Sequence, residues 1–192
     1  MRNHYHALLK GIPKDWLKKE IVAGRSMGIT GMVGSHLADY IMNNSDWDIA
    51  GLIRWRSPLD NISHLLDDIN NNKRIKLVYG DLKDSISLDK AIEETKPDFF
   101  FHLAAQSFPK TSFDAPLDTM DTNIQGTNRI LESLRKYAPE ANIHICSSSE
   151  VFGRVPKEKL PIDEECTFHP ASPYAISKVG TDLIGRFYAE AY

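Results

Sequence analysis

A tyrosine and a lysine four residues apart, Tyr174 and Lys178, could act together in proton transfer. Residues at this spacing lie on the same face of a helix. An ammonium group beside a phenol lowers the pKa of the phenol, which then serves as a base near neutral pH. Such pairs occur by chance on many exposed helices, but here residues 147–153, which include Ser148 and Glu150, precede the pair. Together the two runs predict a proton-transfer site.

Residues 28–34, Gly-Ile-Thr-Gly-Met-Val-Gly, are suited to holding a pyrophosphate. Glycines at three-residue spacing allow a tight turn after a strand and a close approach of the backbone to phosphates. The phosphates then meet a helix N-terminus. A plain turn is an equally good interpretation of the glycines alone, but their place between a strand and an amphipathic helix favours phosphate binding. The predicted cofactor contacts in this loop are Gly28, Thr30, Gly31, Met32, Val33 and Gly34.

The end of the second predicted strand bears on the choice of cofactor. Residues 52–57 contain Arg54 and Arg56, and no carboxylate occurs before Asp60. An acidic residue at this place serves the ribose hydroxyls of NAD, whereas arginine suits the 2'-phosphate of NADP. We therefore expect NADP in preference to NAD. The alternative is that both arginines are solvated loop charges.

Short apolar runs alternate with amphipathic stretches along the chain, which is typical of βαβ units and a parallel sheet. Residues 99–101 and 143–145 show little alternation, as expected of strands covered on both faces. The sequence thus predicts an α/β fold with a Rossmann-type, doubly wound parallel sheet. Residues 21–192 form the predicted NAD(P)-binding Rossmann domain, and residues 1–20 an extension of unknown role. The predicted strands are 21–27, 48–53, 75–79, 98–104 and 142–147, and the predicted helices are 33–42, 59–69, 85–94, 116–136 and 173 to the C-terminus.

Composition narrows the class of partner. With 192 residues, 42% of them hydrophobic, the chain is long enough to bury one core. A net charge of -3 argues against nucleic acid as a partner. No apolar run is long enough for a bilayer and residues 1–6 lack a signal-peptide core, so we expect a cytoplasmic protein without a membrane partner. Cys146 and Cys166 are expected to be reduced thiols, and no His, Cys or Asp spacing suggests a metal.

Four further runs occur in a characteristic order after the glycine-rich loop: residues 80–84, 102–108, 123–127 and 148–150. With the Tyr-x-x-x-Lys pair, they resemble the extended short-chain dehydrogenase/reductases, also known as the NAD-dependent epimerase/dehydratase family. Within this family the resemblance is closest to the GDP-mannose 4,6-dehydratases. It extends from residue 28 to residue 192.

The resemblance implies a mechanism. Tyr174, as tyrosinate, takes the proton of the sugar C4 hydroxyl while a hydride passes from C4 to the nicotinamide, and Ser148 hydrogen-bonds the same oxygen. Lys178 holds Tyr174 in its ionised form and binds the nicotinamide ribose. The 4-ketone acidifies the C5 proton, which Glu150 removes as water leaves C6, and the hydride returns to C6. Alternatively Glu150 is structural and pairs with a cation, because related decarboxylases and epimerases also carry a serine-glutamate strand end.

The resemblance also implies contacts to the rest of the dinucleotide. Asp81 and the backbone that follows it meet the adenine, although Asp81 could instead cap the next turn. The remaining implied cofactor contacts are Leu82, Leu103, Ala104, Ala105, Ser107 and Asn123, together with Tyr174 and Lys178.

Two departures from the family pattern affect what this chain is expected to do. Arg25 and Met27 stand where relatives have an apolar first strand ending in threonine. The chain also ends one helix after Lys178, whereas related enzymes continue into a smaller substrate-binding domain. We therefore expect a fold truncated before that domain, and a chain that does not turn over nucleotide sugars by itself. By resemblance it is also expected to form a homodimer through the helices at 116–136 and after residue 173.

Three functions remain open. The first is the cofactor-binding part of a nucleotide-sugar 4,6-dehydratase, a lyase that converts GDP-mannose to GDP-4-keto-6-deoxymannose. The second is an epimerase or a 4-keto-6-deoxymannose reductase, which would use Tyr174 and Lys178 but would not need Glu150 as a base. The third is a non-catalytic dinucleotide-binding module. The residues that read the nucleotide and the sugar are expected mainly beyond residue 192.

Overall fold

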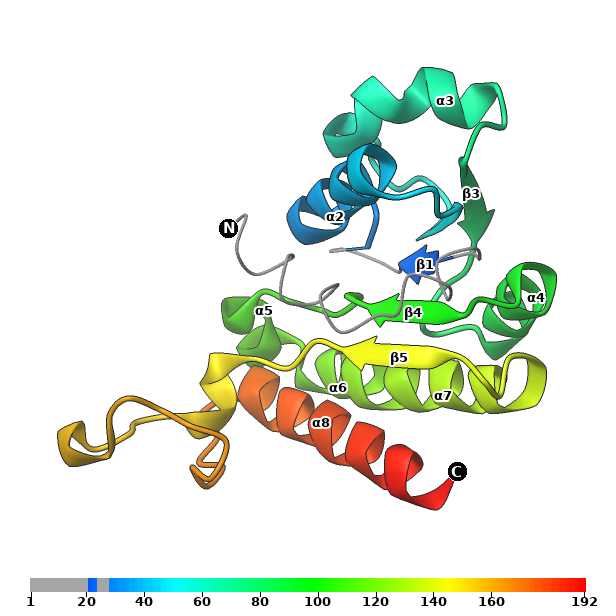
Figure 1. The fold of residues 1–192 in the computed structure, drawn as a ribbon. Helices are drawn as coiled ribbons and strands as arrows, with labels where there is room; N and C mark the ends of the chain where they lie inside the picture. Colours follow the sequence, from blue (N-terminus) through cyan, green and yellow to red (C-terminus); the bar gives the residue numbers. More distant parts are fainter. Residues whose placement is uncertain (1–20, 24–27) are drawn as a thin grey trace.

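A parallel sheet of five strands, in the order β3-β2-β1-β4-β5, runs through the part of the chain that the computed structural model describes, residues 21–23 and 28–192 (Figure 1). Its central strand, β1, pairs with β2 on one side and β4 on the other, so that Ala23 lies opposite both Gly51 and Phe101. This order matches five strands of the dinucleotide-binding sheet 3-2-1-4-5-6 and confirms the predicted Rossmann-type fold. The strands are β1 (Ile21–Ala23), β2 (Ile49–Ile53), β3 (Ile75–Tyr79), β4 (Phe99–His102) and β5 (Asn142–Ile145).

Helices cover the two faces of the sheet (Figure 1). On one face lie α2 (Met32–Asn44), the 3-10 segment η2 (Asp60–Leu65) and α3 (Leu66–Asn70). The other face carries α4 (Ser85–Thr95) and the long helix made of α6 (Pro116–Met120), the π-helical η3 (Asp121–Gln125) and α7 (Gly126–Tyr137). Against this long helix packs α8 (Pro173–Ala191). The remaining short helices are α5 (Pro109–Asp114), η4 (Ser149–Phe152) and η5 (Lys157–Lys159).

Strand β4 separates two apolar cores. Successive side chains of a strand point to opposite faces of the sheet. Phe99 and Phe101 therefore belong to the core beneath α2, and Phe100 to the core beneath α4 and α7. Trp47 stacks on Phe99 with ring centroids 5.0 Å apart. All four residues of β4 are buried, which confirms the prediction of a strand covered on both faces.

The same prediction is wrong for β5. Residues 143–145 are only partly buried, because β5 is the outermost strand of the described sheet. Residues 59–69, predicted as one helix, instead form η2 and α3, because Ile62 has a non-helical backbone (φ -122°, ψ 15°). The helix α5 was not predicted. Residues 1–20 and 24–27, with Arg25 and Met27, lie outside the described residues. Within the described residues, no helix combines the length and the apolar character needed to cross a membrane.

His102, the last residue of β4, is a buried histidine at the centre of the fold. It is 3% exposed, and its Nε2 lies 2.9 Å from Oγ1 of Thr127. The Thr127 hydroxyl donates to the carbonyl oxygen of Asn123, so it accepts its hydrogen bond from the imidazole. Burial, followed by the nearby positive charge of Lys178, lowers the pKa of His102 to about 3. The imidazole is therefore neutral at physiological pH.

Acid should destabilise the fold through His102. The ordinary pKa of 6.5 applies in the unfolded chain and a pKa of about 3 in the folded chain. The stability that this group contributes is thus present above pH 6.5 and is lost as the pH falls from there. Between pH 7 and pH 5 the free energy of unfolding should fall by about 2 kcal/mol through this residue. Urea unfolding at several pH values should give a shallower pH dependence for His102→Gln than for the parent.

His64→Gln is the matched control, because it removes an exposed imidazole that pairs with Asp39. The pH dependence of stability should change more in His102→Gln than in this variant. If the parent and His102→Gln lose stability equally between pH 7 and pH 5, the assignment to His102 is wrong.

Candidate active site

The sheet topology gathers the predicted site residues at one edge. In a parallel sheet all strands end at the same edge, and ligands bind where the strand order reverses. That reversal lies between β1 and β4. The loops that follow the five strands carry, in chain order, Gly28, Arg54, Asp81, Leu103 and Ser148. Residues that are far apart in sequence thus reach a common edge.

The glycine-rich loop turns tightly into α2. The backbone N–H of Gly31 donates to the carbonyl of Gly28 at 2.9 Å, and Gly31 is the N-cap of the helix. A Cβ at Gly34 would lie 1.8 Å from the Gly28 carbonyl oxygen, so a side chain there would push the helix away from the loop. Within the described residues no side chain caps this helix, and its first turn holds no acidic residue. The N-terminal N–H groups are therefore suited to a phosphate.

At the end of β2, a turn orients the two arginines. The N–H of Ser57 donates to the Arg54 carbonyl at 3.0 Å, and Arg56 adopts a left-handed backbone (φ 63°) that is uncommon outside glycine. The Nε of Arg54 is buried and has no hydrogen-bond partner among the described residues. A buried charged donor without an acceptor is costly, and an anionic ligand would remove that cost. These residues fit a phosphorylated cofactor.

At the end of β3, Asp81 shapes its own loop. Its carboxylate accepts from the backbone N–H of Lys83 at 3.0 Å, and its own N–H donates to Ser87 at 3.0 Å. This is the local turn that the sequence allowed as an alternative to adenine binding. The cap of α4 is the neighbouring Asp84, which accepts from the N–H of Ile86 at 3.1 Å.

The loop after β4 is held by Asn123. This residue of η3 is 1% exposed, and its amide exchanges two hydrogen bonds with the backbone of Gln106, of 2.7 and 3.1 Å. The amide nitrogen also donates to the hydroxyl of Ser177 in α8 at 2.8 Å. Both its N–H groups are thereby used inside the protein, so the structure gives the side chain a positioning role. Residues 103–105 are buried, and Ser107 is partly buried.

Gln106 and Ser177 were not predicted as site residues. Both lie inside motifs that were predicted to form the site, and this was the signal available in the sequence. Their specific role became clear only from their shared partner Asn123, which lies 17 and 54 positions away.

The predicted proton-transfer residues meet where β5 ends and α8 begins. Ser172 caps α8 by accepting from the N–H of Ala175 at 3.0 Å, and this places Tyr174 in the first turn and Lys178 one turn later. Both side chains are buried, at 9% and 4% exposure. The Ser148 hydroxyl, at the end of β5, acts on the Tyr174 phenol and lowers its pKa. Glu150 is exposed in the adjoining η4, where its charge acts on the same phenol.

The electrostatics of this corner differ from the expectation. Burial raises the pKa of Tyr174, the Ser148 hydrogen bond lowers it, and Cys146 and Glu150 raise it further. Burial also lowers the pKa of Lys178, whose Nζ donates to the carbonyl of Cys146. The expectation that Lys178 holds the pKa of Tyr174 low is wrong in this structure, because the ammonium is directed at a backbone carbonyl. An ammonium has three donors, so ligand hydroxyls can be bound there as well.

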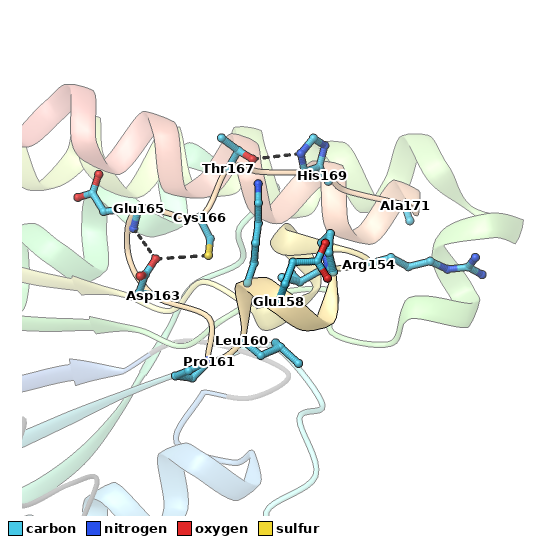
Figure 2. Close-up of a pocket in the computed structure, with 13 residues that line it drawn as sticks. Arg154, Glu158, Leu160, Pro161, Asp163, Glu165, Cys166, Thr167, His169 and Ala171 are labelled. Atoms are coloured by element: carbon cyan, nitrogen blue, oxygen red, sulfur yellow. Dashed lines mark hydrogen bonds between the residues drawn. The ribbon is translucent and has the colours of Figure 1, made fainter.

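A separate pocket of about 930 Å³ lies in the segment between η4 and α8 (Figure 2). The N–H of His169 ties this segment to the Val151 carbonyl at 2.9 Å. Asp163 accepts hydrogen bonds from Glu165 N (3.1 Å) and Cys166 Sγ (3.3 Å) (Figure 2). The pocket lining includes none of the four predicted catalytic residues. Across the described residues, no group of three or more His, Cys, Asp or Glu side chains is placed to hold a metal ion.

Comparisons with known proteins bear on this arrangement. The family model for GDP-mannose 4,6 dehydratase matches residues 27–192. The GDP-mannose 4,6 dehydratase of Drosophila melanogaster is 40% identical over 171 residues, which cover 86% of this chain and 42% of that protein. The chain thus spans less than half the length of this relative.

Solved structures have the same fold. A double mutant of DesIV, the dTDP-glucose 4,6-dehydratase of Streptomyces venezuelae, with NAD and DAU bound, superposes with a TM-score of 0.76 at 24% identity. The superposition covers 91% of this chain and 52% of the DesIV chain. RMD from Pseudomonas aeruginosa, complexed with NADPH, has a TM-score of 0.65 at 26% identity, covering 88% and 47%.

Removing the Asn123 amide should destabilise the fold. Asn123→Ala leaves the backbone of Gln106 and the Ser177 hydroxyl without their buried partner. We expect the free energy of unfolding to fall by roughly 1 to 3 kcal/mol in chemical denaturation. Asn128→Ala, which removes a partly buried bond to Tyr188 one turn along the same helix, should cost less. Equal losses in the two variants would show that the Asn123 network has no special weight.

Proposed function

The chain belongs to the GDP-mannose 4,6-dehydratase family, and from this premise we propose that residues 21–192 are the cofactor-binding part of an NADP-dependent nucleotide-sugar dehydratase. This lyase would convert GDP-mannose to GDP-4-keto-6-deoxymannose. The observation that carries the proposal is that the partly buried Ser148 and the exposed Glu150 lie at one corner with the buried Tyr174 and Lys178. That corner lies at the same sheet edge as the N-terminus of α2, which no side chain of the described residues caps.

Each side chain of the corner has a distinct task. When bound, NADP would accept a hydride from the sugar C4 and return it to C6. Tyr174 takes the proton of the C4 hydroxyl, and Ser148 hydrogen-bonds the same oxygen. Burial and the charge of Glu150 raise the pKa of Tyr174. Ser148 lowers it, and Lys178 is assigned to the ribose hydroxyls of the nicotinamide half.

Glu150 is the proposed base for the C5 proton. Glu150 is exposed in the short helix η4, which follows Ser148, and its charge acts on the Tyr174 phenol. Within the described residues no ion pair of Glu150 is found, and this supports the catalytic reading over a structural one. An epimerase or reductase on this scaffold would not require that base.

For the 192-residue chain alone we propose cofactor binding without turnover. Ser148 is only partly buried and Glu150 is exposed, so the described residues leave the reacting position open to solvent. Alignment of the sugar against Tyr174 depends on binding energy from the nucleotide part of the substrate. The chain spans 42% of its Drosophila relative, and the activity proposed here is that of the whole protein.

We further propose a homodimer formed by the long helix and α8. Ile130, Leu131 and Leu134 of the long helix are buried inside the chain at 0 to 5% exposure, so other side chains must form the contact. The exposed apolar side chains on these helices and on α5 are Phe113, Leu117, Ile176, Leu183 and Phe187.

The cofactor preference should depend on the arginines after β2. We expect NADP to bind more tightly than NAD, because Arg54 presents a buried donor and no carboxylate occurs in the turn. The double variant Arg54→Glu, Arg56→Glu should reduce the preference by roughly 1 to 3 kcal/mol. Calorimetric titration with both dinucleotides measures this. Arg186→Glu, on the exposed side of α8, is the control and should leave the preference intact. Equal affinities in the parent would refute the NADP assignment.

Turnover can be tested by replacing the matching segment of the Drosophila relative with residues 27–192. This chimera should convert GDP-mannose to a 4-keto-6-deoxy sugar, whereas the 192-residue chain alone should give no product above the blank. In the chimera, Tyr174→Phe and Glu150→Gln should each reduce the rate by a factor on the order of 100 or more. Glu158→Gln, in the separate pocket, should not. A folded chimera that binds NADP but forms no product would count against the dehydratase.

The dimer proposal predicts the effect of a charge on α8. Light scattering at micromolar concentration should give twice the mass of the chain for the parent and one mass for Leu183→Glu combined with Phe187→Glu. Ile86→Glu, an exposed apolar residue on α4, is the matched control and should stay dimeric. A monomeric parent would contradict the proposal.

A further inference from the structure

We propose that Arg129 is a positioning residue for the adenine end of the cofactor site, through its hold on the loop that follows β3. The inference rests on the proposed function, since the ligand concerned is the dinucleotide. Arg129 belongs to none of the motifs that pointed to the site. It lies in α7, on the helix that runs beneath that loop.

The guanidinium of Arg129 bridges two segments. Its Nη1 donates to the backbone carbonyl of Leu82 at 2.9 Å, and its Nη2 to the Asp121 carboxylate at 2.9 Å. Leu82 itself is fully buried, whereas the Arg129 and Asp121 side chains are 28% and 40% exposed. The rigid fork of a guanidinium suits such a two-point contact. The Asp121 pair orients the fork, and the Leu82 bond fixes a backbone carbonyl of the loop.

Two other contacts join the loop after β3 to the long helix. A Cβ at Gly126 would lie 2.9 Å from Cβ of Leu82, so the close approach of loop and helix requires glycine at this position. Lys83, the residue after Leu82, forms an ion pair with Asp118 in α6. That pair is solvent-exposed and contributes little by itself. The contact of Arg129 differs because it holds the backbone that orients Asp81 and Leu82.

The long helix connects the Arg129 contact to the catalytic end of the site. Asp121 begins the π-helical η3, and two residues later Asn123 binds Gln106 and Ser177 at the catalytic end of the site. One continuous helix thus holds the loop after β3 through Arg129 and the catalytic helix through Asn123. The distance between the adenine end and Tyr174 is fixed by this helix. Loss of Arg129 should therefore loosen the adenine end alone.

Binding measurements on the 192-residue chain test this role. The ligands are NADP, its adenine half 2'-phospho-ADP-ribose, and nicotinamide mononucleotide. With Arg129→Met we expect NADP and the adenine half to bind roughly tenfold more weakly, the effect of one hydrogen bond from a charged donor. Nicotinamide mononucleotide should bind as to the parent. Arg129→Lys, which keeps the charge but not the fork, should show an intermediate loss.

Arg135→Met is the matched control, because it removes an arginine of the same helix whose ion pair with Glu132 is exposed. It should leave all three affinities unchanged. If Arg129→Met does not fold, Asp121→Asn, which weakens the hold on the guanidinium, should shift the affinities in the same direction to a smaller extent. Thermal unfolding of each variant checks that the protein is folded at the temperature of the binding measurements.

Three results would overturn the inference. Parent-like binding of NADP by Arg129→Met would leave the proposed function standing and remove the role of Arg129. An equal loss for nicotinamide mononucleotide would show general destabilisation instead of positioning. No binding of NADP by the parent chain would refute the proposed cofactor function, and this inference with it.

Discussion

The amide of Asn123 fixes the relation between the sheet and the catalytic helix. Three short hydrogen bonds tie it to the loop after β4 and to Ser177 in α8. Its backbone carbonyl also accepts from the hydroxyls of Thr127 at 2.6 Å and Thr181 at 3.1 Å. A buried polar network that is satisfied throughout is rigid and specific. The positions of Tyr174 and Lys178 against Ser148 depend on it.

Burial sets the chemistry of the corner that this network encloses. It raises the pKa of Tyr174, lowers that of Lys178 and keeps His102 neutral. In each case the low polarity of the site disfavours the charged form. The charged forms of the base and of its lysine neighbour are thus less favoured here than in water. Ser148 opposes burial by lowering the pKa of Tyr174. Proton transfer therefore depends on how the Ser148 hydroxyl and the Lys178 ammonium contact the substrate.

The local features of the site followed from sequence because local physics produces them. Glycine spacing predicted the turn at Gly31 and the close contact at Gly34, which the α2 geometry explains. The four-residue spacing of Tyr174 and Lys178 placed both on one helix. Alternation of apolar runs gave the parallel sheet, and residues 75–79 form the predicted strand. Each of these depends on residues close together in the chain, where backbone geometry leaves few alternatives.

The tertiary structure alone decided the features that join distant residues. Asn123 and Ser177 are 54 positions apart and Arg129 and Leu82 are 47 apart, and no periodicity links such pairs. The exposure of β5 depends on its being the outermost described strand, and the raised pKa of Tyr174 depends on what covers the phenol. The sequence by itself determined the fold class and the residue types of the site. Packing decided their partners and their charge states, because burial and long-range hydrogen bonds exist only once the elements have come together.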